Sequence, residues 1–180
     1  MATAKEVHEF WFRELTKKDH FAKNEAIDSE IRRRFLPEMK LAARAELFSW
    51  RESSLGRLSE IIVLDQFSRN VYRDRPESFA QDPLALALAQ EAVQLKCDRE
   101  VSIYERSFFY LPFMHSESRV VHEQAVTLFS QPGLEDNLKF EHLHKRIIDQ
   151  FGRYPHRNST LGRESTREEL DFLKTANSSF

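Results

Sequence analysis

The chain has 180 residues, 41% of them hydrophobic, and its 27 basic and 29 acidic residues give a formal net charge of −2. This length and composition predict one globular domain over residues 1–180 and exclude a disordered chain. The near-neutral charge argues against nucleic acid as the main partner, because phosphate binding needs a basic face. With only 4 glycines and 6 prolines, the composition favours long helices over turn-rich sheets.

The longest aliphatic run, Ile61 to Leu64, is too short to span a membrane, and the N-terminus lacks the apolar core of a secretory signal. Cys97 is the only cysteine, so no internal disulfide can form. We therefore expect a soluble protein of the cytoplasm that makes no contact with membranes.

The first two helices are predicted from capping patterns and apolar spacing. Thr3 and Glu6 form a capping box ahead of an amphipathic stretch, with His8 on its solvent side. A second helix is expected from Asn24, with a kink or a restart at Pro37.

The segment from Ile61 to Asn70 predicts a buried helix, because apolar residues cover nearly its whole circumference. Asp65 projects among these apolar residues, and Arg69 follows one turn later. A charged side chain in a buried helix must be paired or must face a wet cleft. The segment is thus either a structural ion pair or the floor of a binding site. Three further residues extend its polar stripe: Gln66, Asn70 and Arg73.

The starts of the later helices are predicted by capping residues: Asp82 ahead of Pro83, Ser102 with Glu105, Ser116, and Ser165 with Glu168. Gly152 stands where a glycine commonly ends a helix, and the tail from Asn177 to Phe180 is expected to fray. No segment alternates with period two. We therefore predict an all-α fold, a single compact domain of about seven or eight helices.

Two more polar segments interrupt the helical pattern. The first is His115, Ser116 and Glu117, where a carboxylate would lie near the positive end of a helix. Good capping explains Ser116 fully and Glu117 in part, but it does not explain His115.

The second is the long connection from Gly152 to Glu164. Guanidinium groups bind carboxylate or phosphate through paired hydrogen bonds, and a histidine can bind an anion or transfer a proton. The connection therefore indicates either an anion site or a loop anchored by its polar groups. Its candidate residues are Arg153, His156, Arg157, Asn158 and Arg163.

Histidine spacing gives no sign of a metal site. His144 falls on the apolar face of its helix, where a satisfied core residue is commoner than a ligand, and His142 points elsewhere. The chain has no HExxH motif, no cysteine framework and no glycine-rich nucleotide loop. We expect neither a metal nor another cofactor.

Five segments carry a family resemblance: EFWF, LDQFSRNVYR, FAQDPLAL, YLPFMHSES and FGRYPHRNSTLGRES. Together they resemble the mainly bacterial family called domain of unknown function 924, from about Val7 to Leu173. The resemblance implies an all-helical array similar to tetratricopeptide-repeat proteins, and no activity comes with it. The family usually has proline where this chain has Ser68, and a proline there would end the helix near Phe67, ahead of Arg69.

The family motifs imply one candidate ligand-binding site without assigned roles. Its residues are Asp65, Gln66, Arg69, Asn70, His115, Ser116, Glu117, His144, Arg153, His156, Arg157, Asn158 and Arg163. We expect the three polar segments to surround one concavity.

Two functions are compatible with these residues. The first is binding of a small phosphate or carboxylate ligand, or of a peptide carboxylate, in an arginine-rich cleft. The second is a metal-independent hydrolase or transferase, in which Asp65 or Glu117 orients His115 or His156 as acid or base and an arginine stabilises negative charge. A scaffold for another protein is a third alternative that a polar cleft disfavours.

Overall fold

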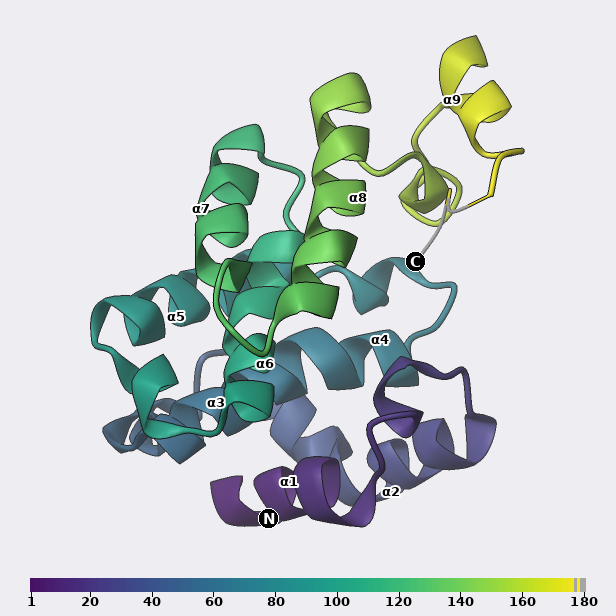
Figure 1. The fold of residues 1–180 in the computed structure, drawn as a ribbon. Coiled ribbons are helices and arrows are strands. Elements are labelled where there is room, and N and C mark those ends of the chain that lie inside the picture. Colours follow the sequence, from purple (N-terminus) through teal and green to yellow (C-terminus); the bar gives the residue numbers. More distant parts are fainter. Residues whose placement is uncertain (177, 179–180) are drawn as a thin grey trace.

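The computed structural model describes residues 1–176 and 178, and this part of the chain is helical with no β-strand. The all-α prediction is thus confirmed, while most of the tail expected to fray lies outside the described residues. The helices labelled in Figure 1 are, from α1 to α9, Ala4–Glu9, Glu25–Ala42, Ser54–Ile62, Ser68–Val71, Asp82–Gln94, Ile103–Met114, Arg119–Phe129, Glu135–Phe151 and Arg167–Phe172.

Helices α3 and α4 form one continuous rod, joined by a single π-helical turn at Val63–Phe67. The rod begins where the Ser53 hydroxyl accepts the N–H of Gly56, and all its residues from Leu58 to Ser68 are buried. Because Ser68 continues the helix, the break that a proline would cause is absent and Arg69 stays within the rod. π-turns often lie at functional sites.

The other helices pack around this rod. Helices α1 and α2 cover it on one side, and α5 and α6 on another, while α7 and α8 stand beyond α6 (Figure 1). Helix α6 contacts α3, α5, α7 and α8, so every residue from Ser107 to Met114 is buried. Helix α2 runs through Pro37 without a restart.

Aromatic side chains fill the space between α1, α2 and the rod. The Phe67 ring lies 5.2 Å from the Phe35 ring and 5.7 Å from the Trp11 ring, measured between centroids. All three side chains are almost fully buried. Large rings packed in this way contribute much of the hydrophobic stabilisation.

The capping boxes at Thr3 with Glu6 and at Ser102 with Glu105 are confirmed. Asn24 caps α2 as predicted. The three later caps are displaced by one or two residues, because the expected caps have other partners. The Asp82 carboxylate binds arginines instead, and Ser116 accepts the N–H of Ser118 in a turn. The actual caps of the three helices are Gln81 for α5, Ser118 for α7 and Thr166, in a capping box with Glu169, for α9.

The prediction that His8 faces solvent is also wrong. His8 Nε2 lies 2.8 Å from the Glu105 carboxylate, and its side chain is 12% exposed. This contact joins α1 to α6 across 97 residues of sequence. Among the described residues, no helix has both the length and the apolar character needed to cross a bilayer.

Candidate functional site

The three polar segments, far apart in sequence, meet in space. His115 Nδ1 lies 2.7 Å from Asp65 Oδ1, and Arg157 donates to the backbone oxygen of His115 over 3.0 Å. Arg163 forms two hydrogen bonds with the Glu117 carboxylate, at 2.7 and 2.9 Å. The rod, the end of α6 and the connection after α8 therefore converge on one cluster of charged groups.

The π-turn places Asp65 at the centre of this cluster. Its side chain is 1% exposed, yet three groups satisfy it. Arg69 lies 2.9 Å from Oδ1, and Gln66 donates to Oδ2 over 2.5 Å, in addition to His115. Burial opposes ionisation, but Arg69 and then His115 outweigh it and hold the pKa of Asp65 well below its usual range.

The Asp65 carboxylate also determines the protonation state of His115. An ionised carboxylate only accepts hydrogen bonds, so the Nδ1 atom of His115 carries the proton. Burial and the nearby Arg69 charge lower the pKa of His115, against the raising effect of Asp65. The ring is therefore neutral near pH 7, with its Nε2 lone pair available as an acceptor or base.

Asp82, the first residue of α5, is shared by two arginines. Arg69 donates to both of its oxygens at 2.9 Å, and Arg157 donates to Oδ2 at 3.1 Å. Asp82 is 14% exposed, against 1% for Asp65. Asp82 therefore marks the solvent side of what we call the inner network: Asp65, Arg69, Asp82, His115 and Arg157.

Arg157 lies deep in the inner network. Its guanidinium carbon is 4.5 Å from the centre of the Phe79 ring and 4.6 Å from that of Tyr154. The side chain is 8% exposed, and burial followed by the Arg69 charge lowers its pKa. Its Nε–H is buried and has no hydrogen-bond acceptor among the described residues.

A second set of ion pairs, which we call the outer network, anchors the connection after α8. Arg163 holds Glu117, and Arg153 holds Glu169 with hydrogen bonds of 2.6 and 2.7 Å. Asn158 bridges the two pairs, because it accepts from Arg163 and donates to Glu169. These residues account for the anchoring function expected of the connection.

Tyr154 links the two networks. Its backbone N–H donates to Glu117 over 2.7 Å, and its hydroxyl donates to the backbone oxygen of Met114 over 2.5 Å. The rings of His144 and His156 lie 5.7 and 5.5 Å from the Tyr154 ring. Burial is the main cause that lowers the pKa of His144 to about 3 and that of His156 to about 4, so both imidazoles are neutral near pH 7.

Not every predicted residue joins the cluster. Asn70 and Arg73 bind Asp28 on α2, away from His115. Ser116 contributes its backbone oxygen to His122 Nε2 at 2.8 Å. His144 is buried with Nδ1 2.8 Å from the Phe140 oxygen, as expected for a satisfied core residue.

Sequence reasoning missed three participants: Asp82, Tyr154 and Glu169. Asp82 stands in the FAQDPLAL motif, but its position before Pro83 also fits a simple helix cap. Tyr154 stands inside the candidate connection but carries no charge. Glu169 was missed because the sequence predicts the capping box at Ser165 and Glu168, whereas the actual box pairs Thr166 with Glu169. Asp82 and Glu169 each have a local position at a helix start that the sequence explains, so their contacts with distant arginines could not be inferred from it.

The comparisons with known proteins identify the family. A family model described as bacterial protein of unknown function (DUF924) matches residues 7–177. The chain belongs to this family. A solved structure, that of the protein of unknown function ATU0120 from Agrobacterium tumefaciens, is 37% identical and superposes with a TM-score of 0.91. That match covers 95% of this chain and 96% of the other. No functionally curated protein matches the sequence.

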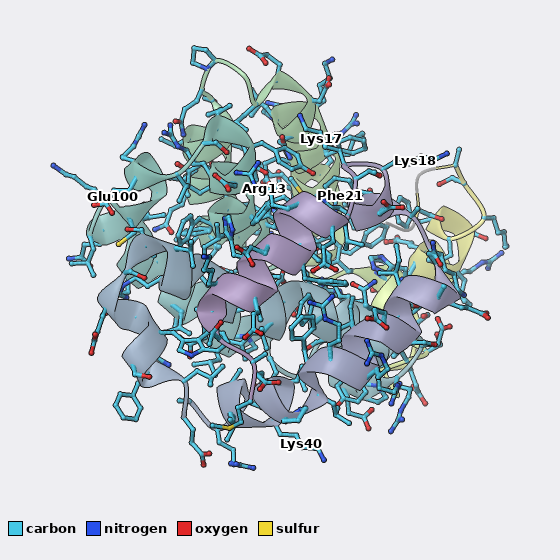
Figure 2. The ribbon with its side chains drawn as sticks, turned by 90° about the horizontal axis from the view of Figure 1, so that it is seen from below. Arg13, Lys17, Lys18, Phe21, Lys40 and Glu100 are labelled. Carbon is cyan, nitrogen blue, oxygen red and sulfur yellow. The ribbon has the colours of Figure 1, made fainter. Side chains whose placement is uncertain are left out.

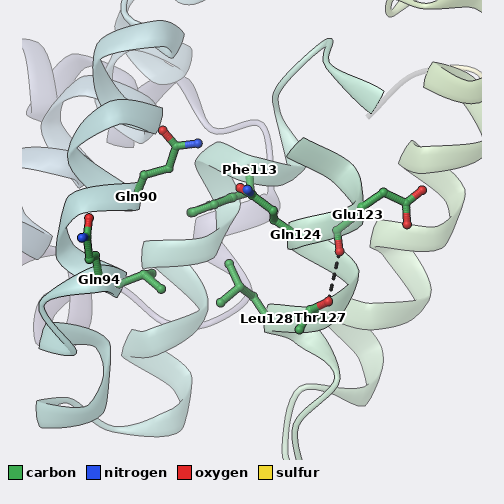
Figure 3. A pocket seen from close by; sticks show the side chains of 8 residues that line it. Gln90, Gln94, Phe113, Glu123, Gln124, Thr127 and Leu128 are labelled. Atoms are coloured by element: carbon green, nitrogen blue, oxygen red, sulfur yellow. Dashed lines mark hydrogen bonds between the residues drawn. The ribbon is translucent and has the colours of Figure 1, made fainter. Parts of the chain in front are cut away.

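Two hollows are described in this DUF924 protein, and neither is lined by the inner or the outer network. The larger, of about 590 Å³, opens between α5 and α7 over Phe113 and Leu128 (Figure 3). Its rim carries the amides of Gln90, Gln94 and Gln124. The two networks are thus packed clusters rather than the lining of these hollows.

Metal ligands are not grouped in the described part of the chain: no three histidine, cysteine, aspartate or glutamate side chains there are placed to hold an ion. The expectation of a metal-independent protein comes from the histidine and cysteine spacing and stays a prediction.

Proposed function

We propose that this DUF924 protein binds a small anion, through a phosphate or carboxylate group, between Arg69 and Arg157. The observation that supports this best is the buried Nε–H of Arg157, which has no acceptor among the described residues. Leaving a buried donor unsatisfied costs about 1–3 kcal/mol, and more when the donor is charged. A ligand oxygen at this position would recover that energy.

The charge arrangement supports the same proposal. Two guanidinium groups share the carboxylate of Asp82 on the solvent side of the inner network, so both could also reach one ligand anion there. Asp82 lies at the first turn of α5 and is 14% exposed, so it is the carboxylate of the inner network nearest to solvent. An entering phosphate or carboxylate would replace Asp82 and accept from both arginines.

Inorganic phosphate is a direct probe of this proposal. The wild-type protein should melt higher in phosphate than in chloride of equal ionic strength, and Arg157→Lys should lose about tenfold in phosphate affinity, because lysine lacks the Nε–H and the planar fork. Asp82→Asn should bind phosphate more tightly, because it removes the competing carboxylate.

Arg73→Lys is the matched control, since Arg73 holds Asp28 outside both networks. If Arg157→Lys melts lower but keeps the full response to phosphate, and Asp82→Asn gains no affinity, the networks are structural and the binding proposal is wrong.

A second candidate function rests on the contact of 2.7 Å between Asp65 and His115. A carboxylate that holds Nδ1–H leaves Nε2 of a neutral imidazole as a general base, and the neighbouring arginines could stabilise developing negative charge. Release of nitrophenol from p-nitrophenyl acetate or phosphate tests for hydrolase activity. His115→Gln should abolish that release; release that survives the substitution excludes His115 as the base.

We also propose the cytoplasm as the setting, because the one cysteine, Cys97, is a buried thiol without a disulfide. Reducing compartments favour such thiols.

A further inference from the structure

The smaller hollow lies on another face of the protein, away from both networks. It has a volume of about 280 Å³ and lies beside the π-turn Phe10–Glu14, the turn at Asp19–Phe21 and the start of α6. Arg13, Lys17, His20 and Tyr104 line it. Figure 2 shows Arg13 and Lys17 together on the face seen from below, with Lys40 at the far edge of that face.

The two cations of this hollow differ from the arginines of the networks. Neither Arg13 nor Lys17 has a carboxylate partner among the described residues, whereas each network arginine has one. Lys17 Nζ instead lies 4.4 Å from the centre of the Tyr104 ring. A cation–π contact positions the ammonium group and leaves its charge available for an anion.

The nearby acids are already occupied. Asp19 accepts the N–H and the hydroxyl of Thr16 at 2.8 and 2.6 Å. Glu105 completes the capping box of α6 and also meets His8 at 2.8 Å. Glu105 itself lines the hollow, and each of its oxygens has a partner within the fold. Arg13 and Lys17 are the charged groups of this hollow without a partner of opposite charge among the described residues.

The buried ring of His20 determines the direction of the Tyr104 hydroxyl. His20 Nε2 lies 2.6 Å from the backbone oxygen of Trp11, which only accepts, so Nε2 carries the proton. Burial lowers the pKa of His20, so the ring is neutral and Nδ1 accepts. The Tyr104 hydroxyl, 2.5 Å away, therefore donates to Nδ1, and its oxygen keeps lone pairs for another donor.

We propose that this hollow is a second binding site, for a small phosphorylated or carboxylated compound that also carries a hydroxyl group. Arg13 and Lys17 bind the anionic group, and the ligand hydroxyl donates to the Tyr104 oxygen. At roughly 30 Å³ for each water-sized group, the volume suits about ten non-hydrogen atoms. Glycerol 3-phosphate has this size and chemistry and serves as the probe.

Calorimetric titration with glycerol 3-phosphate tests the proposal. We expect saturable binding that weakens about tenfold in Arg13→Gln and in Lys17→Gln, and that is unchanged in the matched control Lys40→Gln. Tyr104→Phe keeps the ring and removes the oxygen. It should therefore weaken the binding of glycerol 3-phosphate and leave the binding of inorganic phosphate unchanged. No saturation, or an equal loss in Lys40→Gln, would overturn the proposal.

Two further measurements separate the alternatives. Vesicles of phosphatidylglycerol that bind the protein without competition from glycerol 3-phosphate would assign the face to a lipid surface and overturn the soluble-ligand site. Arg157→Lys should leave glycerol 3-phosphate bound at the hollow, while Arg13→Gln should leave the phosphate response of the inner network intact. The proposal for the hollow and the proposal for the inner network can therefore be tested independently.

Discussion

Asp65 and His115, separated by 50 positions in the chain, share a hydrogen bond of 2.7 Å between Oδ1 and Nδ1. The same carboxylate oxygen lies 2.9 Å from Arg69. One buried atom thus joins the π-turn of the central rod to the end of α6, and it sets both the charge balance and the histidine tautomer of the inner network.

Replacing Asp65 with asparagine should destabilise the protein by about 3 kcal/mol, because it removes one partner of a buried charge pair. This loss of stability lies at the lower end of the range for buried charge pairs, because Arg69 still forms its ion pair with Asp82. Urea denaturation followed by circular dichroism measures the change. Asp74→Asn, at a side chain that is 89% exposed, should stay within about 0.5 kcal/mol of wild type; equal effects in the two variants would refute the buried-pair argument.

The same substitution should lower the pKa of His115 further. Asp65 raises that pKa, whereas burial and Arg69 lower it, so removing the carboxylate leaves only the charge of Asp82 to oppose the lowering effects. Titration of the imidazole by nuclear magnetic resonance measures the shift, and nitrogen chemical shifts in wild type should show the proton on Nδ1 at pH 7. A His115 pKa that rises in Asp65→Asn contradicts this account.

Acid should lower the free energy of unfolding by protonating Glu169. Its hydrogen bonds with Arg153 lower its pKa from 4.5 to about 2, so the folded state favours the ionised carboxylate. The resulting stability, of about 3 kcal/mol, is complete above pH 4.5 and is lost as the pH falls toward 2. Glu169→Gln should be less stable than wild type at pH 7. Its free energy of unfolding should also fall less than that of wild type between pH 4.5 and 3. Glu168→Gln, at an exposed neighbour, should follow the wild-type curve.

Gly56→Ala should also be destabilising, although alanine normally stabilises a helix relative to glycine by about 0.5–1 kcal/mol. A Cβ atom at Gly56 would lie 1.9 Å from the backbone oxygen of Trp50. The turn at Phe48–Glu52 would have to shift, at a cost of about 1–3 kcal/mol. A urea midpoint above that of wild type would show that the turn yields easily.

The sequence by itself determined the helical class and many helix ends, because these depend on neighbours within a few residues. The boxes at Thr3 and Ser102 and the glycine ending α8 at Gly152 are local hydrogen-bond and backbone patterns that a short segment contains in full. The motif residues of the candidate site could likewise be selected from the sequence, since charged groups stand out against an apolar helix.

Only the tertiary structure decided which groups those residues contact. The sharing of Asp82 between Arg69 and Arg157, like the contact of His8 with Glu105, joins elements that the chain path brings together. A carboxylate at a helix start satisfies the local capping rule and a distant arginine equally well, so local pattern cannot choose between them. Burial and the positions of distant charges make that choice, and they exist only once the helices have packed.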